Sequence, residues 1–380
     1  MNDILGIVRV GRLQALIFVC LLHAAPAVAQ DEPWTLFPES DSGLSAGGWI
    51  SAGFHSASND LFNSDPERLN LHQAWLFAEQ SAARDDGSLG VGFRVDFMYG
   101  TDAGDTQAFG NSLDANGNPR RWDNVSSFQY DHGYGLALPQ AYVEVAKDNW
   151  SVIAGHFYTL IGYEVVTAPD NFFYSHAITM YNSEPFTHTG VLASIGVGGG
   201  DTTIYGGYTL GWDTGFDRFE SGSNFLGGVS TPLGDKVSFT YITTIGDFGA
   251  RGGDVYSHSL VFDVALSDAL NWVIQSDYLN VGTTEEQNVG LNQYLFYTLN
   301  DMVALGTRFE WWRGDDVTGY APHGGLSLGP DEDHFAWTFG TNVSIERNFT
   351  LRPEIRFNWS DEDAADYSKT VGAMDLVMTF

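Results

Sequence analysis

Large apolar and small or polar side chains alternate along most of the chain beyond residue 44. In 88–98 every second residue is large and apolar, and the residues between include Arg94 and Asp96. Because successive side chains of a strand point to opposite faces, this period predicts strands with one apolar face. The pattern predicts sixteen strands, at 45–55, 69–80, 88–98, 138–147, 149–158, 188–198, 201–212, 222–231, 235–246, 255–266, 269–281, 287–298, 302–313, 334–345, 348–360 and 370–380.

The links between these segments alternate in length. From the second strand onward, every second link is short, as at 147–149 and 300–301, whereas those at 99–137, 159–187 and 314–333 are long. Bacterial outer-membrane barrels have short periplasmic turns and longer external loops, and a soluble sandwich has no reason to sort its loops in this way. We therefore expect an all-β fold: a transmembrane, antiparallel, up-and-down β-barrel of about sixteen strands over residues 45–380.

Both ends of the chain fit this interpretation. The last strand finishes on Phe380, and a terminal aromatic residue is expected to act as the signal for barrel assembly and to close the seam with the first strand. Residues 1–29 carry Arg9 and Arg12, an apolar run and a final Ala-Val-Ala, which predicts a signal peptide that is removed. Residues 30–44 are then a periplasmic lead-in.

Composition excludes some classes of function. The chain has 44 Gly and 26 Phe, and its formal net charge is -31, which disfavours nucleic acid as a partner because phosphate binding needs clustered Lys and Arg. Neither Gly-x-Ser-x-Gly nor His-Glu-x-x-His occurs, so we expect no enzyme. Aromatic residues near strand ends are expected to form interfacial girdles, with ordinary core residues as the alternative: Trp49, Trp150, Trp212, Trp272, Trp311, Trp312 and Trp359.

The link at 159–187 is long and aromatic, and it is the third external loop by count. It is too apolar to remain in water, so we expect it to fold into the lumen and narrow the channel. Glu164, Asp170 and Glu184 could then set charge selectivity, with Tyr163 and His176 at the same constriction. In the alternative, the aromatic residues only brace the wall and the acids form local hydrogen bonds.

Charged residues also occur on the face of the strands that is expected to line the lumen. They are Arg94, Asp96, Arg308, Glu310, Arg352, Glu354 and Arg356. Arginines opposite an acidic constriction would create a transverse field that orients polar solutes. Alternatively, neighbouring Arg and Glu neutralise each other across strands.

One loop segment partly matches a calcium site. Asp114 to Asn118 resembles the start of a calcium loop, but Pro119 replaces the turn Gly and Val125 the bidentate Glu. We expect no cofactor, and calcium in this loop is the weaker alternative.

Several long motifs resemble the putative beta-barrel porin-2 family of planctomycete-type bacteria. They include Arg94-Val-Asp-Phe-Met-Tyr-Gly-Thr-Asp-Ala103, Gly155-His-Phe-Tyr-Thr-Leu-Ile-Gly-Tyr-Glu-Val-Val166, Phe172-Phe-Tyr-Ser-His-Ala177 and Glu184-Pro-Phe-Thr-His-Thr-Gly-Val191. The resemblance implies a porin-like barrel, and it brings no substrate and no established functional residues with it.

The sequence thus predicts an integral protein of the bacterial outer membrane that lets small hydrophilic solutes diffuse passively and favours cations. Its expected partners are outer-membrane lipid, the barrel assembly machinery and small polar solutes, and a homotrimer is one option. The alternative is an occluded barrel that serves as a structural or partner-binding surface protein.

Overall fold

The computed structural model describes residues 35–37, 43–58, 62–84, 87–113, 119–123, 133–199, 201–218, 220–315, 331–361 and 367–380. The predicted signal peptide, residues 1–29, and most of the lead-in lie outside these residues.

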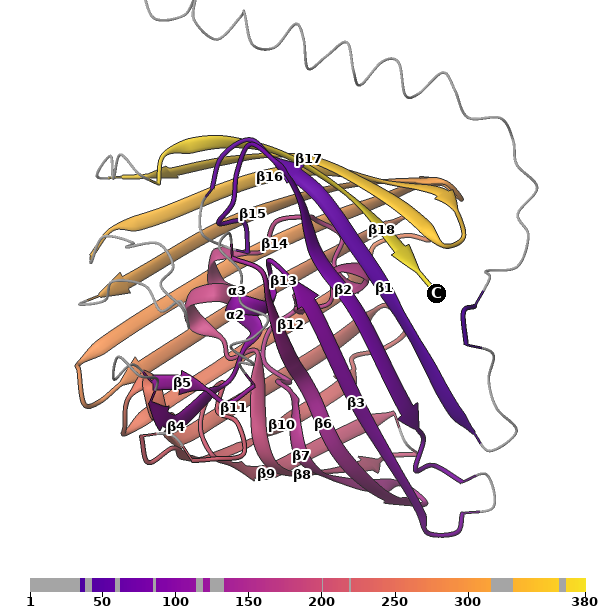
Figure 1. Ribbon diagram of the computed structural model, residues 1–380, viewed down its shortest axis with the longest axis vertical. Helices are drawn as coiled ribbons and strands as arrows, with labels where there is room; N and C mark the ends of the chain where they lie inside the picture. Colours follow the sequence, from indigo (N-terminus) through magenta and orange to yellow (C-terminus); the bar gives the residue numbers. More distant parts are fainter. Residues whose placement is uncertain are drawn as a thin grey trace, which may run out of the picture.

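Sixteen antiparallel strands close into one barrel, which confirms the predicted fold (Figure 1). Every predicted strand is present, and each boundary agrees to within three residues. The strands are β1 (Leu44–His55), β2 (Leu69–Gln80), β3 (Gly90–Gly100), β6 (Gly135–Lys147), β7 (Trp150–Tyr158), β8 (Thr187–Val197), β9 (Thr202–Thr209), β10 (Ser223–Pro232), β11 (Val237–Asp247), β12 (Val255–Ala265), β13 (Leu270–Val281), β14 (Glu286–Asn300), β15 (Val303–Asp315), β16 (Asp333–Glu346), β17 (Phe349–Ser360) and β18 (Lys369–Thr379).

The seam joins the first and last strands. β1 pairs with β18 from Trp49–Thr379 to His55–Ala373. Phe380 extends this ladder, because its N–H donates to Gly48 O at 2.9 Å and its carbonyl accepts from Gly48 N at 2.9 Å. A Cβ at position 48 would lie 2.0 Å from Trp75 O and 3.0 Å from the Phe380 ring, so glycine permits this closure.

The two faces of the barrel follow the alternation in the sequence. In β17, Ile355, Phe357 and Trp359 are exposed on the lipid side, and Arg352 and Arg356 are buried on the lumen side. An apolar exterior suits lipid, and the polar interior is the arrangement found in outer-membrane barrels.

Three tryptophans predicted for the girdles lie elsewhere. Trp49, Trp212 and Trp312 are at most 5% exposed and belong to buried clusters, so the girdle prediction is wrong for them. The period of two gives the reason for one of them: Trp311 and Trp312 are adjacent, so they cannot both face lipid. Trp150 and Trp359 are exposed, as predicted.

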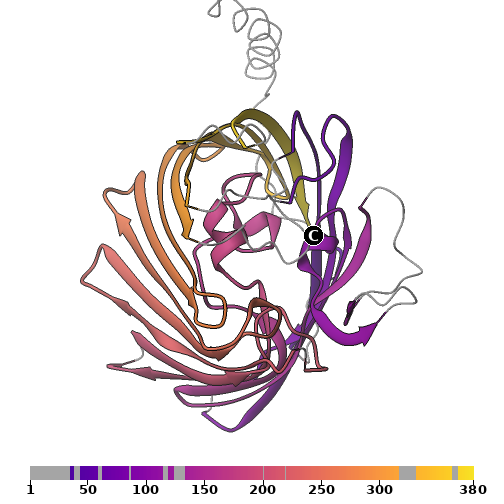
Figure 2. The same cartoon turned by 90° about the vertical axis from the view of Figure 1, so that its left-hand side faces the viewer.

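The external loops add short elements to the barrel. They contain α2 (Ala103–Thr106), the hairpin β4 (Phe109–Leu113) with β5 (Pro119–Arg121), η2 (Ala168–Asp170), α3 (Ile178–Ser183) and η3 (Gly249–Arg251). Within the described residues, no helix is both long and apolar enough to cross a bilayer. Figure 2 shows α3 enclosed by the ring of strands.

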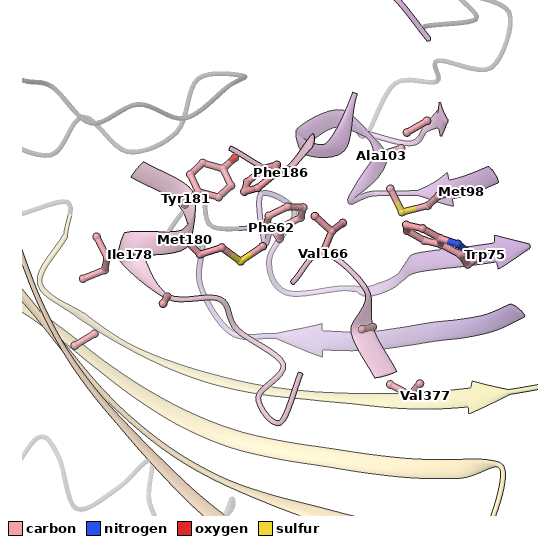
Figure 3. Close-up of a cluster of buried hydrophobic side chains, with 14 of the residues drawn as sticks. Phe62, Trp75, Met98, Ala103, Val166, Ile178, Met180, Tyr181, Phe186 and Val377 are labelled. Atoms are coloured by element: carbon pink, nitrogen blue, oxygen red, sulfur yellow. The ribbon is translucent and has the colours of Figure 1, made fainter. Parts of the chain in front are cut away.

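An apolar core fills part of the interior. Phe62 from the first loop contacts the rings of Tyr181 and Phe186, and Met180 and Val166 belong to the same cluster (Figure 3). A second cluster joins Trp212 and Phe248, from the loops after β9 and β11, to inward residues of the wall. Loops therefore pack inside the barrel through buried apolar contacts.

Candidate functional site

The third loop, residues 159–186 between β7 and β8, crosses the inner wall of the barrel. Its Phe172 ring lies where a side chain on Gly306 would stand, with an ideal Cβ only 2.3 Å away. Phe173 similarly lies over Gly340, at 3.0 Å. Gly306 and Gly340 are register partners on β15 and β16. These two adjacent glycines leave a flat area of the wall on which the loop packs.

Arg308 on β15 holds the next turn of the loop. It is fully buried, and its guanidinium donates to Glu164 Oε1 at 2.6 Å, to Ser175 O at 2.7 Å and to Glu310 Oε1 at 2.6 Å. A planar guanidinium offers five donors in a fixed fork, so one side chain can fix two segments of loop and its own wall.

Two further arginines of β17 bind backbone carbonyl groups of the loop. Arg352 Nη1 donates to Ala168 O at 2.6 Å and to Asn171 O at 2.8 Å, while its Nη2 donates to Asp375 Oδ2 at 2.6 Å. Arg356 Nη1 donates to His176 O at 3.0 Å. Arg308, Arg352 and Arg356, called the wall arginines below, therefore satisfy carbonyl groups that the irregular loop leaves without a ladder partner.

Wall carboxylates bind the N–H groups of the same stretch. Ile178 N donates to Glu310 Oε2 at 2.7 Å, and Ser175 N donates to Glu354 Oε2 at 3.1 Å. The loop is thus hydrogen-bonded to the wall through both kinds of backbone group. Such a buried network fixes the conformation of the loop, as long as every group in the network keeps its partner.

The helix α3 completes the attachment. All six of its residues are buried. Thr179 Oγ1 donates to Asn292 Oδ1 at 3.1 Å and Ser183 Oγ to Asn288 Oδ1 at 2.8 Å, both on β14. On the other side, Tyr181 OH donates to Asp105 Oδ1 of the second loop at 2.5 Å. The helix is held between the wall and a neighbouring loop.

The three acids proposed for the constriction have different surroundings. Burial alone would raise the pKa of Glu164, but Arg308, assisted by His176 and the Ala177 N–H, outweighs it and lowers the pKa to about 2. Burial and the nearby Asp277 carboxylate raise the pKa of Glu184 well above its usual range. Asp170 is exposed, and its Oδ2 accepts from Thr167 Oγ1 at 2.6 Å.

The other predicted site residues also have defined partners. Tyr163 is half-buried against Tyr294, with 4.9 Å between ring centroids. His176 is buried, with its Nδ1 3.6 Å from Glu164 Oε2. Arg94 Nε donates to Asp96 Oδ1 at 2.8 Å. The charged residues of the wall are arranged as neighbouring pairs of opposite sign. The roles of all these residues in a pore stay predictions.

The sequence pattern did not identify several residues of this site. Asp375 pairs with Arg352, and Gln275 Nε2 donates to Glu184 Oε1 at 2.5 Å. Gly306 and Gly340 seat the loop. Their positions on the inward face could be found by alternation, but only the path of the loop shows which of the many inward polar and glycine residues it contacts.

No metal site is evident in the part of the chain that the structure describes, because no three His, Cys, Asp or Glu side chains gather there in a suitable cluster. The segment considered for calcium, residues 114–118, lies outside the described residues.

Family comparison decides the class of this barrel. Residues 43–380 match the putative beta-barrel porin-2, OmpL-like family. The chain belongs to this family. Membership, together with the closed barrel, makes the protein an integral porin-like barrel of the outer membrane. A comparison with curated proteins found no match.

Solved structures show the same fold at very low sequence identity. An anion-selective porin from Comamonas acidovorans is 10% identical, with a TM-score of 0.61 over 89% of this chain and 99% of that chain. OmpT, an outer membrane protein of Vibrio cholerae in trimer form, is 12% identical, with a TM-score of 0.56 and the same coverage. The outer membrane channel DcaP of Acinetobacter baumannii is 12% identical, with a TM-score of 0.54 over 90% and 99%. These likenesses support the fold of this member of the porin-2 family.

Proposed function

We propose that this porin-2 protein is a non-enzymatic channel for passive diffusion of small hydrophilic solutes, with the third loop at its narrowest point and a preference for cations. One observation carries the proposal: an irregular loop is fixed across the inner wall by the buried wall arginines. A loop held in this way narrows the cross-section of the lumen and is not free to open and close.

The charge balance supports a cation preference. At the level of the third loop, the three wall arginines face four carboxylates, those of Glu164, Glu310, Glu354 and Asp375. The guanidinium groups are therefore compensated and leave no net positive field, while Asp170 adds an exposed acid. A narrow site lined by excess acid attracts cations and repels anions.

Reversal potentials across a KCl gradient in planar bilayers test this preference. Among the three acids of the loop, Asp170 is exposed, whereas Glu184 is buried against the wall. Asp170→Asn should therefore lower the K⁺/Cl⁻ permeability ratio more than Glu184→Gln, because an exposed acid acts directly on passing ions. Glu346→Gln, at the exposed end of β16, is the matched control. A ratio that all three variants leave unchanged would contradict cation selection by this loop.

The same packing favours one rival function, an occluded barrel that acts as a structural or partner-binding surface protein. Its support is the complete burial of α3 and the buried Trp212 and Phe248 cluster in the interior. Removing residues 165–183 separates the two. A parent protein that conducts, with a several-fold larger conductance in the deletion variant, supports the channel. A parent that inserts and folds but carries no current supports the rival.

We also propose outer-membrane lipid and the barrel assembly machinery as partners, on the basis of the apolar exterior and the closed seam. A homotrimer is a further proposal, for which the trimer form of the structurally similar OmpT is the support. Native mass spectrometry of the detergent-extracted protein tests it.

A further inference from the structure

The underside of the third loop presents a group of aromatic rings near the periplasmic end of β14. Phe172 lies 4.8 Å and Tyr163 6.5 Å from Phe296, measured between ring centroids. All three are only partly buried, unlike Phe173 and Tyr294 behind them. The rings thus form an aromatic surface of Tyr163, Phe172 and Phe296 with faces or edges open to the lumen.

A carboxylate lies beside this aromatic surface. Asp263 on β12 is a register partner of Val273, which in turn is a partner of Tyr294. Val261, two residues from Asp263 on the same face, packs in the aromatic cluster. Asp263 is half-buried. Burial of the Tyr163 hydroxyl, and to a smaller extent the negative charge of Asp263, raises the pKa of Tyr163 to about 12. An acid and the aromatic surface therefore border the same part of the lumen.

A cavity of about 470 Å³ extends from Phe296 toward the periplasmic rim. Asn271 and Thr298 contribute polar groups to its wall. At the rim, Lys236 is accompanied by Asp235 and Asp268, so acids outnumber the one base among its lining residues. A space of this size accommodates a small organic molecule.

We propose that Asp263 and the aromatic surface form a binding subsite for small aromatic ammonium ions that enter from the periplasmic side. The ring faces carry negative electrostatic potential that attracts a cation, and they also stack with another ring. Asp263 supplies the counter-charge. The subsite rests on the proposed cation-favouring lumen, whose acidic character would concentrate such ions.

Benzylammonium is a suitable probe, with benzyl alcohol as its neutral counterpart and benzenesulfonate as its anionic one. Binding to the full-length protein folded in detergent is measured by titration with saturation-transfer difference NMR, which requires no ion current. Benzylammonium should bind about tenfold more tightly than benzyl alcohol, which corresponds to one cation–π contact of ordinary strength near a carboxylate. Benzenesulfonate should bind least.

The variants Asp263→Asn and Phe296→Leu should each weaken benzylammonium binding about tenfold. Matched controls come from β6, where Glu144 and Tyr142 supply an acid and an aromatic ring away from the rings of the third loop. Glu144→Gln and Tyr142→Leu should leave the affinity unchanged. Equal affinity for the three probes, or equal losses in the test and control variants, would overturn the proposal.

A second measurement separates this subsite from the channel function. Benzylammonium added on the periplasmic side should reduce the K⁺ current of the parent, and Asp263→Asn should relieve that block. Benzylammonium binding with no current in any protein would contradict the channel and leave the subsite supported. A normal current that benzylammonium does not block would instead contradict the subsite.

Discussion

At the scale of single residues, the wall arginines convert an irregular loop into a fixed structure. Arg308 contacts two acids and the carbonyl of Ser175 without exposure to water, so its replacement leaves Glu164 buried without its cation. Arg308→Met should lower the free energy of unfolding by about 3–5 kcal/mol, the cost of breaking a buried ion pair. Arg308→Lys should recover only part, because an ammonium lacks the planar fork.

Urea unfolding of the protein in lipid vesicles measures this difference. Arg313→Met is the control, because Arg313 is a partly exposed residue of the same strand. Equal unfolding midpoints for Arg308→Met and Arg313→Met would show that the buried network contributes nothing to stability.

The pKa of Glu164 predicts how acid affects the loop. In a released, solvated loop the carboxyl would titrate near 4.5, whereas in the docked loop the pKa is about 2. The depressed pKa means that docking is favoured above pH 4.5 and that this contribution is lost as the pH falls toward 2. Protease cleavage of the third loop should therefore increase between pH 4.5 and 2, measured with an acid-active protease. Glu164→Gln should reduce the pH dependence of this cleavage. If the variant is cleaved with the same pH profile as the parent, the dependence comes from other groups.

At the scale of elements, two glycines select the path of the third loop. Gly306→Ala places a methyl group 2.3 Å from the Phe172 ring, whereas Gly206→Ala on β9 meets nothing within 4 Å. Gly306→Ala should displace the loop, at a cost of about 1–3 kcal/mol, as overpacking does. It should also change single-channel conductance, and Gly206→Ala should not. Identical conductance in both variants would mean that the loop does not limit the current.

The elements themselves differ in how well the sequence predicts them. The strands were predicted because alternation is local, and β17 shows its buried arginines and exposed aromatics within twelve residues. The position of the third loop inside the barrel was also predicted from its apolar content. Its contacts were not, because Arg352 and Ala168 are 184 residues apart and no local pattern links them. The same limit applies to Trp212, which alternation cannot place once its strand has ended at Thr209.

At the scale of the whole molecule, Phe380 extends the seam that closes the barrel. Phe380 forms two backbone hydrogen bonds with Gly48, and its ring lies against the position of the missing Gly48 side chain. Without them, the N–H and C=O of Gly48 in β1 would lose their partners, and in lipid each unpaired group costs several kcal/mol. Deletion of Phe380 should therefore reduce the yield of folded, heat-modifiable barrel strongly.

The matched control is Phe357→Ala, which removes a lipid-facing aromatic ring that is 39% exposed but leaves the backbone ladder intact. Its folded yield should stay near that of the parent. A third variant, Phe380→Ala, separates the two contributions, because it keeps the backbone bonds and removes the ring. If its yield matches that of the deletion, the ring is the assembly signal. If it matches the parent, the seam requires the backbone pairing alone, and equal yields for all three variants would show that neither is needed.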